Sequence, residues 1–382
     1  MSHNGGRNIA IIGGGIGGLT AALSFARQRA NVTVYEQAPA LTEVGAGIQI
    51  TPNAMRVLTR LDLAGAMAAS CLRAEAVEPV DGLTGKPLAR FDLSDQAAPY
   101  YFCHRAALID LLGRACEAIG VRIKLDSRIE DFADDGSFQT SDGRVQPDVT
   151  IGADGIRSVT RKQVIVPEQP FFTGQVAWRA VIRKADLPPV ARIWMLPRRH
   201  VVTYPLSKGR VNMVAVQARS QWADEGWHHQ DDPGNLRAAF SDAGWELKGM
   251  LGEVETTHLW GLFRHNVAKS WYKGRFVILG DAAHPTLPFL AQGANLAIED
   301  AYVLASCCDA REDLPLAFGE YQVKRHARVS RAIAAANTNA RNYHLTGLRR
   351  DVAHSGLRLM GRFAPGAFLR RLDWLYDHDV TA

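Results

Sequence analysis

Residues 275–301 read RFVILGDAAHPTLPFLAQGANLAIEDA, and this stretch decides the fold. The apolar run Phe276–Leu279 predicts a buried strand that ends at Gly280 and Asp281. After a loop with two prolines, a helix is expected to begin near Gly293. A carboxylate that accepts hydroxyl protons, beside a helix start with free N–H groups, suits a polyol phosphate. The stretch therefore predicts one half of a dinucleotide site.

The first forty residues supply the other half. A short apolar strand precedes GGGIGG at residues 13–18, a helical pattern follows it, and a second strand ends at Glu36. In this context the glycines allow a tight turn, close approach to a pyrophosphate and close helix packing, and Glu36 can hold a ribose hydroxyl. Glu36 also argues against a dinucleotide that carries a 2′-phosphate at this ribose. The glycines of this G-x-G-x-x-G pattern are Gly13, Gly15 and Gly18.

A third strand end lies at residues 152–158, where an apolar strand runs into GADGIRS with its Asp154. From residue 175 the pattern changes to alternating strands, which predicts an antiparallel sheet that covers the nucleotide domain. We expect an α/β fold in three parts. These are a discontinuous Rossmann-like dinucleotide-binding domain (residues 1–75, 100–174 and 262–345), an inserted antiparallel sheet domain (76–99 and 175–261) and a C-terminal helical segment (346–382).

Composition narrows the class of protein. The net charge is +5 and the pI is near 9.0, but the basic residues are scattered, so no nucleic-acid surface is expected. Glycines and arginines interrupt the apolar stretch at residues 9–30, so no membrane span is expected either. Five cysteines without metal-ligand spacing predict free thiols, no metal site and a cytoplasmic location. They are Cys71, Cys103, Cys116, Cys307 and Cys308.

Three motifs in this order resemble the single-component FAD-dependent aromatic hydroxylases, the flavoprotein group of para-hydroxybenzoate hydroxylase. They are GGGIGG with Glu36, GADGIRS, and LGDAAHPTLPFLAQGANLAIEDA at residues 279–301. Further strings resemble the salicylate, 3-hydroxybenzoate and 6-hydroxynicotinate hydroxylase branch. They are GAGIQITPN at 45–53, HRAAL at 104–108, AWRA at 177–180 and DWLY at 373–376.

The resemblance implies a monooxygenase with a Rossmann-like FAD-binding domain and an inserted antiparallel-sheet substrate-binding domain. It would use NADH or NADPH, which would bind transiently without a Rossmann domain of its own. It would hydroxylate a small phenolic or heteroaromatic acid with O2, through an electrophilic flavin C4a-hydroperoxide. The residues that would contact FAD are Gly13, Gly15, Gly18, Glu36, Gln37, Gly47, Arg105, Asp154, Asp281, Gly293, Ala294 and Asn295.

Such an attack needs an electron-rich ring, and a base that deprotonates a phenol provides one. His200 and Tyr204 lie four residues apart on a predicted strand, so they point to the same face. We expect His200 to be the base and Tyr204 to orient the substrate. The alternative, a pair on the solvent face of an edge strand, stays open.

Other residues near the predicted pocket have weaker signals. Gln49 would face either the ring or a strand neighbour, and His284 is expected to be structural. Arg179 and Arg192 are candidates for a substrate carboxylate, although each also fits an ordinary sheet arginine. The residues predicted to line the substrate pocket are Gln49, Pro288 and Phe289.

Two other functions compete with hydroxylation. A flavin oxidase or dehydrogenase on the same scaffold would omit oxygen insertion, and a plain NAD-dependent dehydrogenase would bind no flavin. The sequence leaves open the ring substrate, the carbon attacked, any coupled decarboxylation, the choice of nicotinamide and whether the chain is a monomer or a homodimer.

Overall fold

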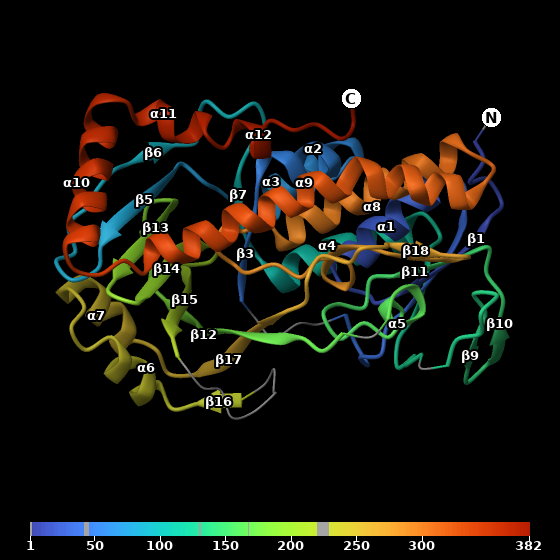
Figure 1. The fold of residues 1–382 in the computed structure, drawn as a ribbon, viewed down its shortest axis with the longest axis horizontal. Coiled ribbons are helices and arrows are strands. Elements are labelled where there is room, and N and C mark those ends of the chain that lie inside the picture. The colour runs from blue at the N-terminus through green and yellow to red at the C-terminus, as the bar shows by residue number, and fades with distance from the viewer. Residues whose placement is uncertain (1, 42–45, 130, 167, 220–228) are drawn as a thin grey trace.

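A mainly parallel sheet forms the nucleotide-binding half of the molecule in the computed structural model, which describes residues 2–41, 46–129, 131–166, 168–219 and 229–382 (Figure 1). Within these residues the strand order is β18-β19-β11-β1-β2-β8, and only β18 runs antiparallel to its neighbour. The strands are β1 (Asn8–Ile12), β2 (Asn31–Tyr35), β8 (Arg122–Lys124), β11 (Val149–Gly152), β18 (Tyr272–Lys273) and β19 (Phe276–Ile278).

Helices α1 (Ile16–Arg27) and α8 (Gly293–Ala310) pack against each other beside this sheet. Small residues allow the close approach, because a Cβ on Gly17 would lie 2.9 Å from Leu279 and 3.2 Å from Ala297. Around them lie short sheets and the remaining helices of this half. These are β3 (Gly47–Ile50), β4 (Leu72–Arg73), β7 (Tyr101–His104), β9 (Phe138–Thr140), β10 (Gly143–Val145), α2 (Pro52–Arg60), α3 (Ala64–Ser70), α4 (Arg105–Ala118), α5 (Arg161–Val164) and a 3-10 turn, Gly280–Ala282.

A second, largely antiparallel sheet has the order β16-β17-β12-β15-β14-β13-β5-β6 in the described part of the chain. Its strands are β5 (Ala76–Asp81), β6 (Phe91–Asp92), β12 (Phe171–Arg183), β13 (Val190–Leu196), β14 (Arg199–Leu206), β15 (Arg210–Ala218), β16 (His229–Asp231) and β17 (Thr257–Arg264). β12 begins before residue 175 and β17 ends after residue 261, so both strands extend past the predicted boundaries. The domain limits stay a prediction.

The two faces of this sheet have different neighbours, because successive side chains on a strand alternate in direction. Trp178 and Trp194 lie in a core cluster with residues of α6 (Pro233–Ala239) and α7 (Trp245–Gly252). Ala177, on the opposite face, packs in a cluster with Leu287 and Phe289 of the nucleotide-binding half. The second face therefore meets the predicted cofactor domain.

The C-terminal part connects both halves (Figure 1). Helix α9 (Leu314–Tyr343) crosses the molecule, and α10 (Gly347–Phe363) stands at the far edge beside the antiparallel sheet. The chain then returns through α11 (Pro365–Arg370) to α12 (Asp373–Tyr376), which contacts α2.

The cysteines differ from the expectation. Cys71 and Cys103 pair as a disulfide across 32 residues, so the prediction of five free thiols is wrong for these two. No local pattern relates the two positions, which tertiary structure alone brings together. Cys116, Cys307 and Cys308 are free and buried, and burial raises the pKa of Cys116 to about 12.

A buried ion cluster joins α8 to α9. Arg325 is fully buried and contacts Glu299 Oε2 at 2.5 Å and Asp300 Oδ1 at 2.7 Å. Burial alone would raise the pKa of Asp300, but His284 and Arg325 beside it lower that pKa to about 2. Both carboxylates are thus held as anions inside the protein.

Replacing Arg325 by Met should lower the free energy of unfolding by about 3–5 kcal/mol, because it leaves two buried carboxylates without their shared cation. Urea denaturation monitored by circular dichroism measures the change. Arg341→Met, at an exposed position of the same helix, is the control and should change stability by no more than about 0.5 kcal/mol. Equal stability of the two variants would contradict a stabilising role for the cluster.

Candidate active site

Three strand ends meet at one edge of the parallel sheet. Gly13 N donates to Tyr35 O at 2.8 Å, Ala153 N to Ile12 O at 2.8 Å, and Leu279 N to Gly152 O at 3.0 Å. The carboxyl ends of neighbouring parallel strands lie together, which is where α/β proteins bind ligands. The expectation that the three distant motifs converge is confirmed.

The glycine loop is shaped for a ligand on one side. Gly13 has φ +106°, and a Cβ there would lie 2.5 Å from Ala153 O, so no other residue fits. A Cβ on Gly18 would clash with Gly13 O. Gly15 differs, because a Cβ there would meet no protein atom within 4 Å. Gly15 precedes α1, so its open side faces a helix start, which suits an approaching pyrophosphate.

Glu36 lies at the end of β2, next to that loop. Its Oε2 accepts a hydrogen bond from Gly14 N at 2.7 Å, and its Oε1 accepts one from Ala38 N at 2.8 Å. These bonds fix the carboxylate and leave each oxygen a further lone pair for a ribose hydroxyl. Gln37 follows and is exposed.

Asp281 is open to solvent yet closely surrounded by protein. Burial raises the pKa of its carboxyl, and His284, Arg105 and Arg179 oppose that rise. The carboxylate has no hydrogen-bond partner among the described residues, so it is available for the hydroxyls of a ribityl chain. This brings Arg105, from the start of α4, into the same site as the strand end at Asp281.

Helix α8 begins at the same edge. Its N-terminus at Gly293 has no side-chain cap within the described structure, and the first helical backbone bond runs from Leu296 N to Gln292 O at 2.8 Å. The N–H groups of Gly293 and Ala294 therefore face the site with the positive end of the helix dipole. Asn295 instead ties the helix to the residue before α2, since its Oδ1 accepts a hydrogen bond from Thr51 N at 2.9 Å.

Asp154 is engaged in its own turn. Its carboxylate accepts hydrogen bonds from Ser158 Oγ, from Val159 N at 2.8 Å and from Thr160 N at 3.0 Å. The side chain therefore shapes residues 154–160 beside the glycine loop. Direct contact of Asp154 with FAD stays a prediction.

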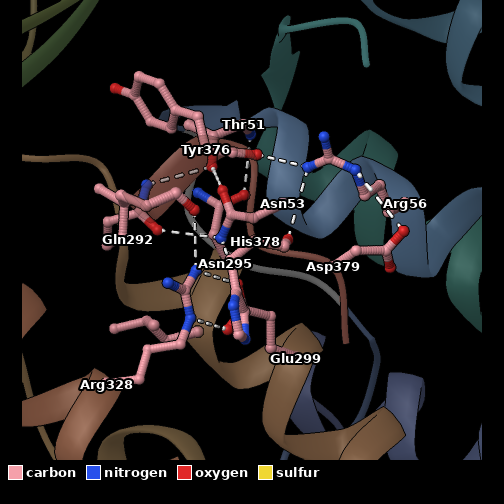
Figure 2. Close-up of polar contacts among 12 residues, drawn as sticks. Thr51, Asn53, Arg56, Gln292, Asn295, Glu299, Arg328, Tyr376, His378 and Asp379 are labelled. Carbon is pink, nitrogen blue, oxygen red and sulfur yellow. Dashed lines mark hydrogen bonds and ion pairs between the residues drawn. The ribbon is translucent and has the colours of Figure 1, made fainter. Parts of the chain in front are cut away.

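A network of polar contacts joins α2, α8, α9 and the C-terminal segment (Figure 2). Asn53 Nδ2 donates to Glu299 Oε1 at 2.6 Å, and Arg328 donates to the same carboxylate at 2.7 and 2.9 Å. Arg328 also donates to the carbonyl oxygens of Trp374 and Leu375, each at 2.8 Å. No local sequence signal predicts these long-range contacts.

His200 is buried, with 1% of its surface exposed, on an interior strand. The solvent-face alternative is therefore wrong. Its Nδ1 lies 2.8 Å from His344 Nε2, and its ring packs 5.3 Å from that of Phe289. Burial, with His344 as a second cause, holds the pKa of His200 well below its usual range, so the ring is neutral at neutral pH.

Tyr204 lies on the same strand and is also buried. Its ring centroid is 5.0 Å from that of Phe102. A Cβ on Gly47 would lie 2.7 Å from both Tyr204 and Asn212, so protein packing already explains the glycine. Contact of Gly47 with the flavin stays a prediction.

Gln49 shares one face of β3 with Gly47, because the two lie two positions apart on the strand. Its Oε1 accepts a hydrogen bond from Tyr100 Oη at 2.5 Å, and the Tyr100 ring packs edge-on against the ring of Tyr376 of α12, with 6.1 Å between the ring centroids. With its oxygen occupied, Gln49 presents its amide N–H groups. Sequence reasoning missed Tyr100 and Tyr376, whose roles depend on this contact.

The structure distinguishes the two arginines that were candidates for binding a substrate carboxylate. Arg192 lies 3.3 Å from Glu78 Oε2 and 2.5 Å from Glu246 Oε1, so it is a sheet arginine. Arg179 packs over the Trp260 ring at 4.2 Å, and within the described residues its guanidinium has no ion pair. Burial, with Arg105 nearby, lowers the pKa of Arg179 to about 10.

His284 has the expected structural role. It is fully buried, its Nε2 lies 2.5 Å from Asp300 Oδ2, and its ring stacks 5.2 Å from Trp271. It therefore holds the loop after Asp281.

Together these features define an FAD-binding domain with an antiparallel sheet placed over the edge where the flavin would lie. The model of a family described as an FAD binding domain matches residues 7–335. The 3-amino-4-hydroxybenzoate 2-monooxygenase PtmB3 of Streptomyces platensis is 37% identical, covering 100% of this chain and 99% of that protein. The 3-hydroxybenzoate 6-hydroxylase of Polaromonas naphthalenivorans is 32% identical, covering 97% and 96%.

The chain belongs to the FAD-dependent aromatic hydroxylases, and it is a flavoprotein monooxygenase. Its fold matches that of a salicylate hydroxylase substrate complex with a TM-score of 0.82 at 23% identity, covering 98% of this chain and 96% of that one. Across the described residues, no helix is both long and apolar enough to cross a bilayer.

Replacing Gly15 by Val should weaken FAD binding by at least about tenfold, because the side chain would fill the open side of the loop, where the pyrophosphate approaches. The fold should persist, since a Cβ at this position meets no protein atom within 4 Å. Titration of apoprotein, followed by quenching of FAD fluorescence, measures the dissociation constant. Gly249→Val is the control at a similarly open glycine of α7. Unchanged FAD affinity of the Gly15 variant would contradict this placement.

Proposed function

We propose that this enzyme uses NADH or NADPH and O2 to hydroxylate a small aromatic or heteroaromatic acid that carries a ring hydroxyl. The names of the relatives, which include a 6-hydroxynicotinate 3-monooxygenase of Pseudomonas fluorescens, all combine a ring, a hydroxyl and a carboxylate. FAD, when bound and reduced by the nicotinamide, would activate O2 for electrophilic attack on the ring. The observation that carries the proposal is the burial of His200 and Tyr204 on the sheet face that meets Phe289 and the cofactor edge. We propose a cytoplasmic location, where nicotinamide is available.

His200 takes the proton of the ring hydroxyl. A neutral imidazole accepts a proton at Nε2, which has no hydrogen-bond partner among the described residues, and Nδ1 shares its hydrogen bond with His344. Burial and the neighbouring His344 both lower the pKa of His200, so the ring meets the substrate as a neutral base. Tyr204 orients the ring from the same face, and Phe289 provides an apolar wall with Pro288 beside it.

Arg179 and Gln49 hold the acid group of the substrate. The guanidinium of Arg179 forms no ion pair with a carboxylate of the described chain, so an incoming substrate carboxylate supplies the missing charge. Gln49 offers donors because Tyr100 occupies its oxygen. A charged anchor and an oriented amide together select a planar acid over a neutral phenol.

A substrate screen tests the proposal directly. Purified yellow enzyme is mixed with NADH or NADPH and with 3-amino-4-hydroxybenzoate, 3-hydroxybenzoate, 6-hydroxynicotinate or salicylate in turn. We expect one acid to stimulate nicotinamide oxidation and to yield a hydroxylated product by mass spectrometry. Stimulated oxidation that yields only hydrogen peroxide from every acid would reject this substrate class.

Replacing His200 by Gln should lower kcat for hydroxylation by about 10²-fold, because glutamine keeps a hydrogen bond to His344 but cannot take a proton. FAD content should stay unchanged. Product formation and nicotinamide oxidation are measured together, so uncoupling is visible. His3→Gln at the exposed N-terminus is the control. A His200 variant with normal hydroxylation would eliminate this residue as the base.

Replacing Tyr100 by Phe should raise KM for the aromatic acid by about tenfold with little change in kcat, because Gln49 loses the contact that orients its amide. Tyr101→Phe, at the next position along the chain and also buried, is the matched control. Steady-state kinetics with the acid found in the screen give both constants. Equal KM values for the two variants would refute the orienting role of Tyr100.

A further inference from the structure

Helix α10 has an unpartnered apolar stripe on its outer face. Leu348, Val352, Leu359 and Phe363 are 79%, 64%, 59% and 73% exposed. Their intervals of four, seven and four residues place them within an arc of about 60° on an α-helix. We call these four side chains the outer stripe. Figure 1 shows α10 at the far edge of the molecule, away from the cofactor domain.

The inner face of α10 is fixed to the antiparallel sheet. Arg350 Nη2 lies 2.7 Å from Asp81 Oδ1, and His354 Nδ1 lies 3.3 Å from Asp81 Oδ2, with all three residues buried. A Cβ on Gly361 would lie 2.7 Å from that of Ala89, so the helix also packs closely at its end. The helix therefore cannot turn to bury the outer stripe within its own chain.

We propose that the outer stripe is the surface through which two copies of this chain pair around a two-fold axis. The stripe is symmetric in sequence about the point between Ser355 and Gly356. In an antiparallel pair centred there, Leu348 faces Phe363 of the second copy, and Val352 faces Leu359 of the second copy. The small residues at the centre allow the two helices to approach closely. A self-complementary patch of this kind is what a two-fold dimer requires.

The charges beside the stripe fit the same arrangement. Asp351, Arg358 and Arg362 lie along one flank of the helix. In the antiparallel pair, Asp351 falls between Arg358 and Arg362 of the second copy, about 3 Å along the axis from each. The two-fold axis repeats this contact, while the two copies of Arg349 on the other flank stay about 20 Å apart.

These charges favour a second copy over an anionic membrane. A membrane-binding helix flanks its apolar face with basic residues that meet anionic headgroups. Here an exposed acidic residue, Asp351, lies among the arginines that would have to meet the lipid. A second copy satisfies both signs of charge, whereas a lipid surface satisfies one.

The small area of the outer stripe predicts a weak dimer. One face of a helix of 17 residues covers less than the about 800 Å² per partner of a typical stable complex. The pair should therefore be reversible and depend on protein concentration. Sedimentation velocity of the FAD-loaded enzyme over a range of concentrations should show a monomer–dimer equilibrium.

Two substitutions test the stripe. Val352→Glu should shift the equilibrium to monomer by at least about tenfold in dissociation constant, because it places a carboxylate against Leu359 of the second copy, in the apolar contact. Val323→Glu is the matched control, since Val323 is 80% exposed on α9 and lies outside the stripe. FAD absorbance and the melting temperature show that both variants are folded.

Exchanging the charges on the flank of α10 tests the antiparallel arrangement of the two helices. Asp351→Arg alone should weaken the dimer, and the triple variant Asp351→Arg, Arg358→Asp and Arg362→Asp should restore it. A wild-type enzyme that is monomeric at every concentration would overturn the proposal. So would a dimer that survives Val352→Glu, or flotation of the enzyme with phosphatidylserine-containing vesicles that depends on the outer stripe while no dimer forms.

Discussion

The buried contact of Arg325 with Glu299 and Asp300 is the constraint on which the active-site architecture depends. Two adjacent carboxylates are removed from water, and such charges are tolerated only when a cation compensates them. Asp300 then fixes His284 and the loop after Asp281, while Glu299 fixes Asn53 at the start of α2. Arg325, together with Arg328 as a second partner of Glu299, thus links the loop after Asp281 to the start of α2, which follows the strand that carries Gln49.

Much of the fold was predictable because its signals are local. Apolar strands that end in glycine and an acidic residue mark the carboxyl edge of a parallel sheet. Three such strand ends along the chain therefore predicted one common site. Alternating residues predicted the second sheet for the same reason. The long-range ties carry no local signal: Arg325 and Arg328 look like ordinary helix residues, and the disulfide between Cys71 and Cys103 joins positions that no spacing relates.

The same distinction between local and long-range signals applies to the residues of the candidate site. A period of two residues established that His200 and Tyr204 share a face, but it does not say whether that face meets water or protein. Burial of His200 against Phe289 and His344 answers this through contacts between elements far apart in the chain. For Gln49 the donor role follows from Tyr100, and for Asp154 the turn at residues 158–160 uses the carboxylate first.

The C-terminal segment explains how the antiparallel sheet keeps its place over the cofactor edge. The chain leaves the nucleotide-binding half through α9, attaches to the sheet where α10 meets Asp81, and returns to place α12 on Arg328. The two halves are therefore joined at points outside the substrate site as well as through it. Because Tyr376 lies at the end of this path and its ring packs against that of Tyr100, the attachment extends to Gln49. The proposed substrate contact of Gln49 and the joining of the two halves consequently share one continuous set of contacts.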